Sequence, residues 1–244
     1  MRLVLVSLLS LVAAAPAWAA TVPEILAKVD SNLTYDTRET TITMTVTKAD
    51  RVKVYKMHSY GRGADEGSVE YLEPARDKGT KMYRKADELW MFLPAVEKVQ
   101  KISGHMIRDR MMGSDMSYED MMQAQKWHDL YTGTLVGEEA CGTGTCWRID
   151  LKAKSPEVSY PRRVILVDEA TYVPVKQELY ALSGMLLKTW EMSEPKAIAG
   201  RNFPMTMTIQ DMVQTGSKTT LHFDTITFSV SVPEEVFSQR WLER

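Results

Sequence analysis

Hydrophobic and polar residues alternate along most of this chain, as they do in half-buried β-strands. The clearest case is Thr41–Thr47, where Ile42, Met44 and Val46 alternate with threonines. Successive side chains of a strand point to opposite faces, so this alternation predicts one buried and one exposed face. The same reasoning predicts strands over residues 41–47, 52–61, 68–72, 80–85, 89–93, 96–102, 130–138, 147–152, 163–167, 173–182, 186–192, 203–212 and 219–229.

The spacing of these segments indicates one wide antiparallel sheet. Turn residues such as Gly, Asp and Ser separate neighbouring segments, and a sheet this wide must curl or close. No Pro/Ser-rich linker, internal repeat or low-complexity block divides the chain. We therefore expect a mainly β protein with few helices and about eleven or twelve strands, in one domain over residues 20–244.

Two segments break the β pattern. Residues 22–29 carry an early proline, a glutamate in the first turn and one apolar face, which together predict a helix. Residues 103–125 are rich in methionine, and Ser117 with Asp120 resembles a capping box. We expect a loop up to about residue 116, a short helix over 118–125, and a one-turn helix near 233–237.

The N-terminus reads as a secretory signal peptide. Arg2 precedes an apolar run from residue 3 to 14, and Ala17 and Ala19 stand in the spacing of a cleavage site. The run is too short for a permanent membrane anchor. We expect cleavage after Ala19 and export to the periplasm.

The two cysteines agree with export. Cys141 and Cys146 flank a Gly/Thr turn between two predicted strands, so a hairpin would bring them within bonding range. An oxidising compartment would close the bridge. The alternative, a metal or redox pair, does not match this spacing. We predict a structural disulfide.

Composition excludes several classes of protein. Hydrophobic residues make up 44% and charged residues 25%, with a net charge of −2, which rules out disordered, collagen-like and polytopic membrane proteins. No basic balance indicates nucleic acid as a partner. No nucleophile elbow, P-loop or dinucleotide-binding glycine motif is present, and the histidines are scattered. We assign no catalytic residue, metal site or cofactor.

The unusual count is 16 methionines against 5 phenylalanines, and six methionines fall between residues 106 and 122. They allow three interpretations: plain core packing, Cu(I) binding by thioethers, or a soft apolar surface that repacks around varied ligands. The apolar strand 89–93 would add a wall to such a surface. The predicted lining and lid residues are Trp90, Phe92, Met106, Met111, Met112, Met116, Tyr118, Met121 and Met122.

Charge is distributed unevenly near this cluster. Residues 76–110 hold nine Lys or Arg against five Asp or Glu, whereas residues 114–150 hold two against seven. A basic edge beside an apolar lid would suit an anionic headgroup or a membrane-bound partner. The residues predicted for that contact are Arg84, Lys98, Lys101, Arg108 and Arg110.

Several motifs, in this order, resemble the outer-membrane lipoprotein-sorting family of LolA-like periplasmic carriers. They are Asp87-Glu-Leu-Trp-Met-Phe-Leu-Pro94, the closing segment Ile226–Phe237, and the stretches Lys78–Met82 and Met112–Asp120. The resemblance implies a half-open antiparallel β-barrel with a helical lid over an apolar cavity. It implies a non-enzymatic carrier that shields acyl chains of a lipoprotein or lipid on the way to the outer membrane. An inner-membrane transporter and an outer-membrane acceptor would be its partners.

One position departs from the family. The carriers have an arginine directly before a proline near the cavity mouth, and Leu72-Glu73-Pro74 has glutamate there. A free lipid therefore fits as cargo as well as a lipoprotein does. The alternatives are a periplasmic copper chaperone that uses the methionines, and an accessory or enzymatic protein on the same half-barrel.

Overall fold

One antiparallel sheet of thirteen strands forms most of the computed structural model, which describes residues 20–49, 51–122 and 126–244. Each of the thirteen predicted segments overlaps one of these strands, so the mainly β prediction is confirmed and the expected count was slightly low. The predicted signal peptide, residues 1–19, lies outside the described residues. In the part of the chain that is described, no helix is long and apolar enough to cross a membrane.

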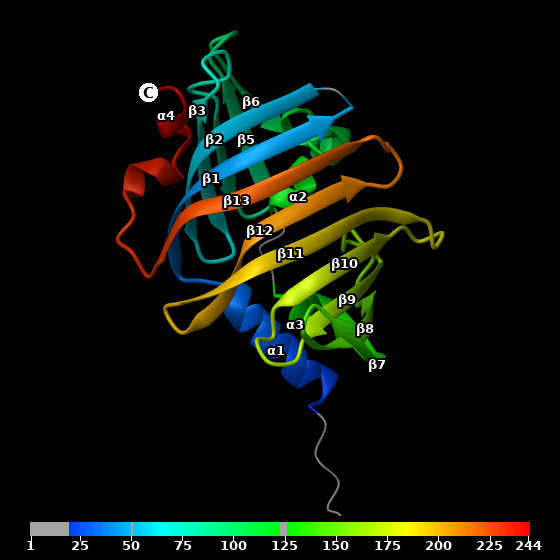
Figure 1. Cartoon of the computed structure of the whole chain (residues 1–244). Helices are drawn as coiled ribbons and strands as arrows, with labels where there is room; N and C mark the ends of the chain where they lie inside the picture. Colours follow the sequence, from blue (N-terminus) through cyan, green and yellow to red (C-terminus); the bar gives the residue numbers. More distant parts are fainter. Residues whose placement is uncertain (1–19, 50, 123–125) are drawn as a thin grey trace, which may run out of the picture.

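The strands follow two meanders that meet in the middle of the sheet. The order is β6-β5-β4-β3-β2-β1-β13-β12-β11-β10-β9-β8-β7 (Figure 1). The strands are β1 (Thr37–Lys48), β2 (Arg51–Arg62), β3 (Glu66–Glu73), β4 (Lys81–Lys85), β5 (Glu88–Leu93), β6 (Lys98–Ile102), β7 (Tyr131–Cys141), β8 (Gly144–Ala153), β9 (Arg162–Asp168), β10 (Pro174–Tyr180), β11 (Leu186–Ile198), β12 (Arg201–Asp211) and β13 (Ser217–Phe228).

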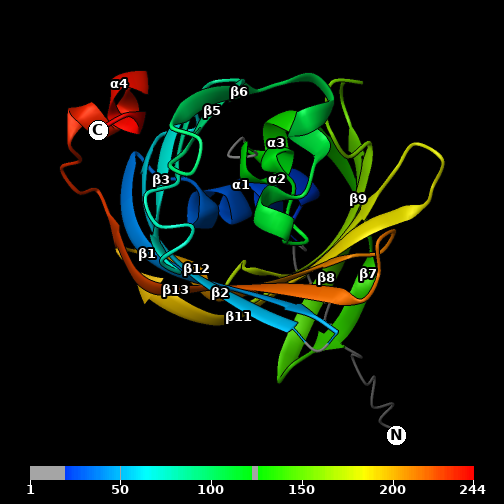
Figure 2. The ribbon, with the colours of Figure 1, turned by 90° about the horizontal axis from the view of Figure 1, so that it is seen from above.

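The sheet curls into a half-open barrel. Among the described residues, the edge strands β6 and β7 each pair with a single neighbour, so the sheet does not close. Helices α1 (Val22–Leu33), α2 (Tyr118–Met122) and α3 (Trp127–Leu130) lie inside the curve, and α4 (Gln239–Leu242) lies outside it (Figure 2). The segment that joins the two sheet edges therefore runs through the concave side.

Helix α1 confirms the sequence prediction and extends it by one turn. Thr21 and Glu24 form a capping box, in which the Thr21 backbone N–H donates to Glu24 Oε2 at 2.8 Å. These hydrogen bonds lower the pKa of Glu24. Ile25, Leu26 and Val29 are buried on the face that the spacing indicated.

Residues 103–116, which were expected to form a loop, contain regular structure. They include two 3₁₀ helices, η1 (Gly104–Arg108) and η2 (Met111–Gly113), before α2. The capping box at α2 is confirmed, because Ser117 N donates to Asp120 Oδ2 at 2.8 Å and Asp120 N donates back to Ser117 Oγ at 3.2 Å. The predicted helix was to continue over residues 123–125, which lie outside the described residues.

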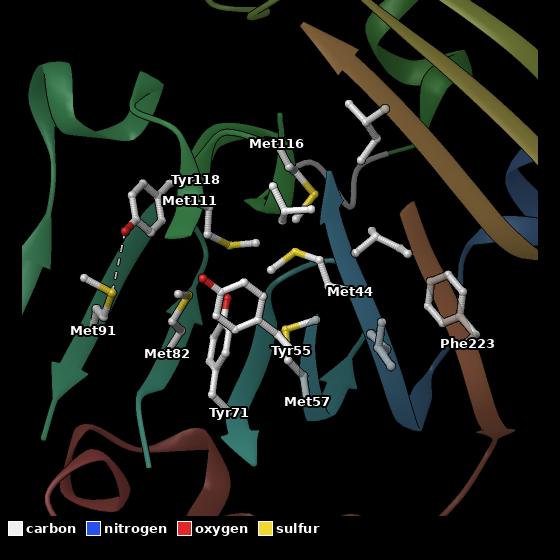
Figure 3. Close-up of a cluster of buried hydrophobic side chains, with 14 of the residues drawn as sticks. Met44, Tyr55, Met57, Tyr71, Met82, Met91, Met111, Met116, Tyr118 and Phe223 are labelled. Carbon is white, nitrogen blue, oxygen red and sulfur yellow. Dashed lines mark hydrogen bonds between the residues drawn. The ribbon is translucent and has the colours of Figure 1, made fainter. Parts of the chain in front are cut away.

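Two apolar clusters fill the concave side. The first, which we call the methionine core, joins the inner faces of β1–β5, β12 and β13 to the segment 106–121 (Figure 3). The second, the α1 core, packs Ile25, Leu26 and Val29 against Ile149, Leu151 and neighbouring residues of β7, β8 and β9. Eleven of the 16 methionines belong to the methionine core, and none of the described residues of the α1 core is a methionine.

A third cluster lies on the outside of the sheet. The C-terminal segment, with η3 (Glu234–Phe237) and α4, packs Val236 and Leu242 onto the outer face of β4 and β5. The predicted one-turn helix near residues 233–237 is thus confirmed. Lys81 Nζ donates to the backbone carbonyl of Arg244 at 2.7 Å and so fixes the end of the chain.

The predicted disulfide joins Cys141 and Cys146 across the β7–β8 hairpin, with 5.8 Å between the Cα atoms. Asp168 lies near the two sulfurs, and among described His, Cys, Asp and Glu residues this is the one group with metal-like spacing. Both sulfurs are in the disulfide bond, so this group offers no thiolate to a metal.

Candidate functional site

A cavity of about 680 Å³ lies between the methionine core and the C-terminal end of α1. This volume falls within the range of about 300–1,000 Å³ that is typical of ligand pockets. Its wall includes inward-facing residues of β1–β3 and β9–β13, and part of the segment that precedes α3. The apolar lining residues are Leu33, Ile42, Met57, Val69, Met111, Met116, Met121, Trp127, Leu179, Trp190, Met192, Phe203, Met207, Leu221 and Phe223.

Strand alternation places these side chains on the concave face. In β2, Tyr55, Met57 and Ser59 are buried while Lys56 is exposed. In β13, Leu221 and Phe223 alternate with outward residues in the same way. Because neighbouring strands are in register, the inward positions of five adjacent strands, β2, β1, β13, β12 and β11, form one continuous apolar surface.

Three of the predicted methionines reach this cavity. Met111 is 2% exposed and Met116 is 7% exposed, and both line the cavity together with the partly buried Met121. Figure 3 shows Met111 and Met116 above Met44, Tyr55 and Met57 of the sheet. The segment therefore covers the sheet, as a lid would.

Three other predicted lid residues, Met106, Met112 and Tyr118, support the lid and are not among the residues that line the cavity. Met106 packs against the methionine core from η1, and Met112 accepts a hydrogen bond at its backbone oxygen from Tyr55 Oη at 3.3 Å. Tyr118 is buried, and its hydroxyl lies 3.7 Å from Met91 Sδ. The side chain of Met122 lies outside what the structure describes.

A buried carboxylate attaches the lid to the sheet. Asp115 is fully buried and forms an ion pair with Arg110 at 2.5 Å. It also accepts hydrogen bonds from Ser217 Oγ at 2.6 Å and Thr219 Oγ1 at 2.7 Å, both on β13. All of these bonds go to the charged carboxylate, and such bonds are stronger than neutral ones.

A second polar attachment holds α2 at the cavity wall. Asp120 forms an ion pair with Lys188 of β11 and accepts a hydrogen bond from Tyr160 Oη at 2.6 Å. Burial, followed by the neighbouring Asp120 charge, raises the pKa of Tyr160. The two carboxylates thus attach the lid to β13 and to β11.

Trp90 and Phe92 lie elsewhere than predicted. They point to the outer face of β5, where Trp90 stacks on Tyr83 with ring centroids 5.6 Å apart and both join the C-terminal cluster. Leu89 and Met91 occupy the inner face instead. Both faces of this strand therefore have apolar contacts, but its aromatic residues cover the outside and not the cavity.

The predicted basic contacts divide into two groups. Arg84 is 7% exposed and donates to the backbone oxygens of Ala64 and Ala86, and burial lowers its pKa. Arg110 is engaged by Asp115, so these two arginines are structural in this conformation. Lys98 and Arg108 are exposed, and Lys101 is paired with Glu88.

Several cavity residues were not predicted, and the most notable are arginines. Arg38, Arg163 and Arg201 all line the cavity. Arg163 is 4% exposed, donates to Gln177 Oε1 at 2.9 Å and lies over the Trp127 ring at 4.7 Å. Arg163, Ile165 and Val167 are two residues apart along β9, so their side chains point to the same face of the sheet. This spacing is a signal from which the inward position of Arg163 could have been predicted.

His128 lies between two carboxylates. Its Nδ1 lies 2.6 Å from Asp30 Oδ2 and its Nε2 lies 2.9 Å from Asp129 Oδ1. Asp30 also accepts from the backbone N–H groups of Trp127 and His128, at 2.8 and 3.0 Å. These contacts occupy both ring nitrogens of His128 and attach α3 to α1. The role of His128 in this arrangement is structural.

An open, curled antiparallel sheet with an internal lid over an apolar cavity defines the LolA-like fold, and solved structures with this fold match the chain. A DUF1329 family protein from Desulfovibrio piger has a TM-score of 0.82 at 22% identity and covers 90% of this chain and 97% of its own. A domain from Vibrio parahaemolyticus, described as an outer membrane lipoprotein-sorting protein, has a TM-score of 0.80 at 24% identity and covers 91% and 98%. A LolA superfamily protein from Nitrosomonas europaea has a TM-score of 0.76 at 23% identity and covers 91% and 100%.

A family model described as that of an uncharacterized protein matches residues 63–244, and this chain belongs to that family. No curated protein matches its sequence. The resemblance to LolA-like proteins that the sequence motifs indicated is therefore confirmed at the level of the fold.

Proposed function

We propose that this protein is a periplasmic carrier that holds the acyl chains of a lipoprotein or lipid and has no catalytic step. The observation that carries the proposal is the cavity of about 680 Å³ under the lid, with a wall rich in methionine. The similarity to structures described as lipoprotein-sorting and LolA superfamily proteins supports it.

The energetics of acyl chains explain why such a cavity is useful. Each methylene group costs about 0.8 kcal/mol to hold in water, so a chain of about fifteen methylenes costs roughly 12 kcal/mol. A carrier must replace most of that burial and still release the chain. Methionine side chains are unbranched and polarizable, so they can repack around chains that differ in length or position.

The lid offers a route for entry and release. Its contacts with the sheet include the charged hydrogen bonds of Asp115 and Asp120, and these groups can exchange protein partners for water. Opening at these points would expose the cavity without unfolding the sheet. A membrane-bound transporter and an outer-membrane acceptor are the partners that such transfer requires.

Blocking the cavity tests this function. Ser59 lines the cavity from β2 and is 4% exposed. A Ser59→Trp substitution should fill the space and abolish binding of a fluorescent acyl probe, and Ser59→Leu should weaken it. Ser193→Trp, on the exposed side of β11, is the matched control. Circular dichroism verifies that each variant is folded, because overpacking costs typically about 1–3 kcal/mol.

Native mass spectrometry of protein purified from the periplasm should show bound lipid or lipidated peptide and so identify the cargo. The proposal fails if the native protein is lipid-free and also binds no acyl probe. It fails equally if Ser59→Trp binds the probe as the native protein does.

A further inference from the structure

Two arginines stand together at one end of the cavity. Arg38 begins the inner wall on β1 and Arg201 is the first residue of β12, and both line the cavity. They are connected through an aromatic pair: Arg38 lies 4.6 Å from the Tyr35 ring, and Arg201 lies 4.6 Å from the Phe228 ring. The two rings are 6.2 Å apart, so the two guanidinium groups border one aromatic surface.

Neither arginine has an anionic partner in the part of the chain that the structure describes. Within residues 20–49, 51–122 and 126–244, no ion pair involves Arg38 or Arg201. The Nε atoms of both are buried without a hydrogen-bond partner in that part of the chain. Arg201 Nη1 donates only to the backbone oxygen of Thr34. Their charge is therefore not neutralised within the described protein.

Arg38 and Arg201 are partly buried, and they differ in their partners from two other arginines of the concave side. Arg110 is neutralised by Asp115, and Arg84 is bonded to two backbone oxygens. A buried polar donor without a partner is energetically costly, and a buried charge is more so. Stacking on aromatic rings holds Arg38 and Arg201 in place but does not satisfy their N–H groups.

The carboxylates of the cavity do not compensate these charges. Asp30 is engaged by His128 and α3, and Asp120 is engaged by Lys188. Asp36 lines the cavity but forms no ion pair within the described residues. In addition, Tyr71 Oη and Trp190 Nε1 on the cavity wall are buried donors that have no partner among the described residues. The cavity thus combines apolar walls with several hydrogen-bond donors that lack acceptors.

We infer that the cavity binds an anionic amphiphile, with its apolar chain along the methionine wall and its carboxylate or phosphate group at Arg38 and Arg201. Guanidinium groups bind carboxylates and phosphates with two parallel hydrogen bonds, and such bonds are strengthened where water is excluded. This inference rests on the carrier function proposed above and specifies the chemistry of its cargo. The anionic group belongs to the same molecule as the acyl chain.

Competition against a neutral fluorescent probe, N-phenyl-1-naphthylamine, tests the inference. The competitors are dodecanoate, dodecanol and acetate, at a pH well above the pKa of the carboxyl group. The variants are Arg38→Gln, Arg201→Gln and the double variant. Arg51→Gln is the matched control, because Arg51 is exposed on β2 and lies away from the cavity.

We expect the native protein to prefer dodecanoate over dodecanol. Each single variant should bind dodecanoate about tenfold more weakly or worse, which corresponds to about 1.4 kcal/mol, with dodecanol affinity unchanged. Unchanged dodecanol binding also verifies that the cavity is intact. Acetate should not compete.

Three results would overturn the inference. Equal binding of dodecanoate and dodecanol, unaffected by the variants, would leave the carrier function standing and remove only the anionic preference. Competition by acetate as strong as that by dodecanoate would indicate a site for small anions. Failure of the native protein to bind either twelve-carbon ligand would contradict the carrier function itself.

Discussion

The two cores under the concave side of the sheet differ in their side chains. The methionine core contains eleven methionines, among them Met44, Met57 and Met82, together with aromatic and aliphatic residues, and it borders the cavity. The α1 core is built largely from Ile, Leu and Val, of which Ile149, Leu151 and Ile165 are each fully buried. Both lie under one continuous sheet.

The difference teaches how one sheet can combine rigidity with adaptability. β-Branched residues have few rotamers and pack in one way, so the α1 core can fix the sheet's shape. Methionine has three rotatable bonds and fills irregular space, so the methionine core can change its packing. A carrier needs the second property only where the ligand is held.

The lid over the methionine core is attached to the sheet by the buried carboxylate of Asp115. Removing this carboxylate should produce the largest loss of stability. Asp115→Ala should lower the free energy of unfolding by about 3–5 kcal/mol, because Arg110 loses its buried partner and two hydroxyl groups lose their acceptor. Urea denaturation followed by tryptophan fluorescence measures it. Asp224→Ala, at an exposed position on β13, is the control. An unchanged midpoint would show that the lid is not fixed by this carboxylate.

The α1 core should tolerate truncation poorly. Ile165→Ala should lower the free energy of unfolding by about 2–5 kcal/mol, because a fully buried side chain leaves a cavity that rigid neighbours cannot fill. The comparison is Val136→Ala on β7, where the side chain is 60% exposed and the change should stay within about 0.5 kcal/mol. A loss at Ile165 no greater than at Val136 would refute the rigid description of this core.

The methionine core should separate stability from binding. Met111→Leu combined with Met116→Leu should lower the free energy of unfolding by less than about 1.5 kcal/mol per site, because the volumes are similar. The range of acyl-chain lengths that the protein binds should narrow, since leucine is less adaptable. Probe competition with a series of fatty acids measures this range, and Met185→Leu, at a residue 52% exposed, is the control. An unchanged range would argue for plain core packing.

Alkaline pH should weaken the methionine core with no effect at neutral pH. Burial raises the pKa of Tyr71, which is fully buried. A raised folded-state pKa means that the unfolded chain releases its proton first, above the ordinary tyrosine value of about 10. The contribution of Tyr71 to the free energy of unfolding is thus fully present below that value and falls as pH rises above it. The free energy of unfolding of the Tyr71→Phe variant should fall less steeply with rising pH, as measured by urea titrations at a series of pH values. Parallel curves would refute this contribution.

Local patterns determined most of the fold. The alternation in each strand, the capping boxes at Thr21 and Ser117, and the hairpin around Cys141 and Cys146 depend on residues close in sequence, so each was predictable. The prediction of a lid over residues 106–122 also depended on a local signal, because the methionines there coincide with a break in the β pattern.

Only the tertiary structure decided which side chains meet at the cavity. Strand 89–93 is apolar at every position, so its periodicity could not show that Trp90 faces outward under the C-terminal segment. Arg110 has a structural role because it pairs with Asp115. Asp115 is held in turn by Ser217 of β13, which is about a hundred residues away along the chain. Arg38 and Arg201 come together because β1 pairs with β13 and β13 with β12, a consequence of long-range strand pairing that no local pattern encodes.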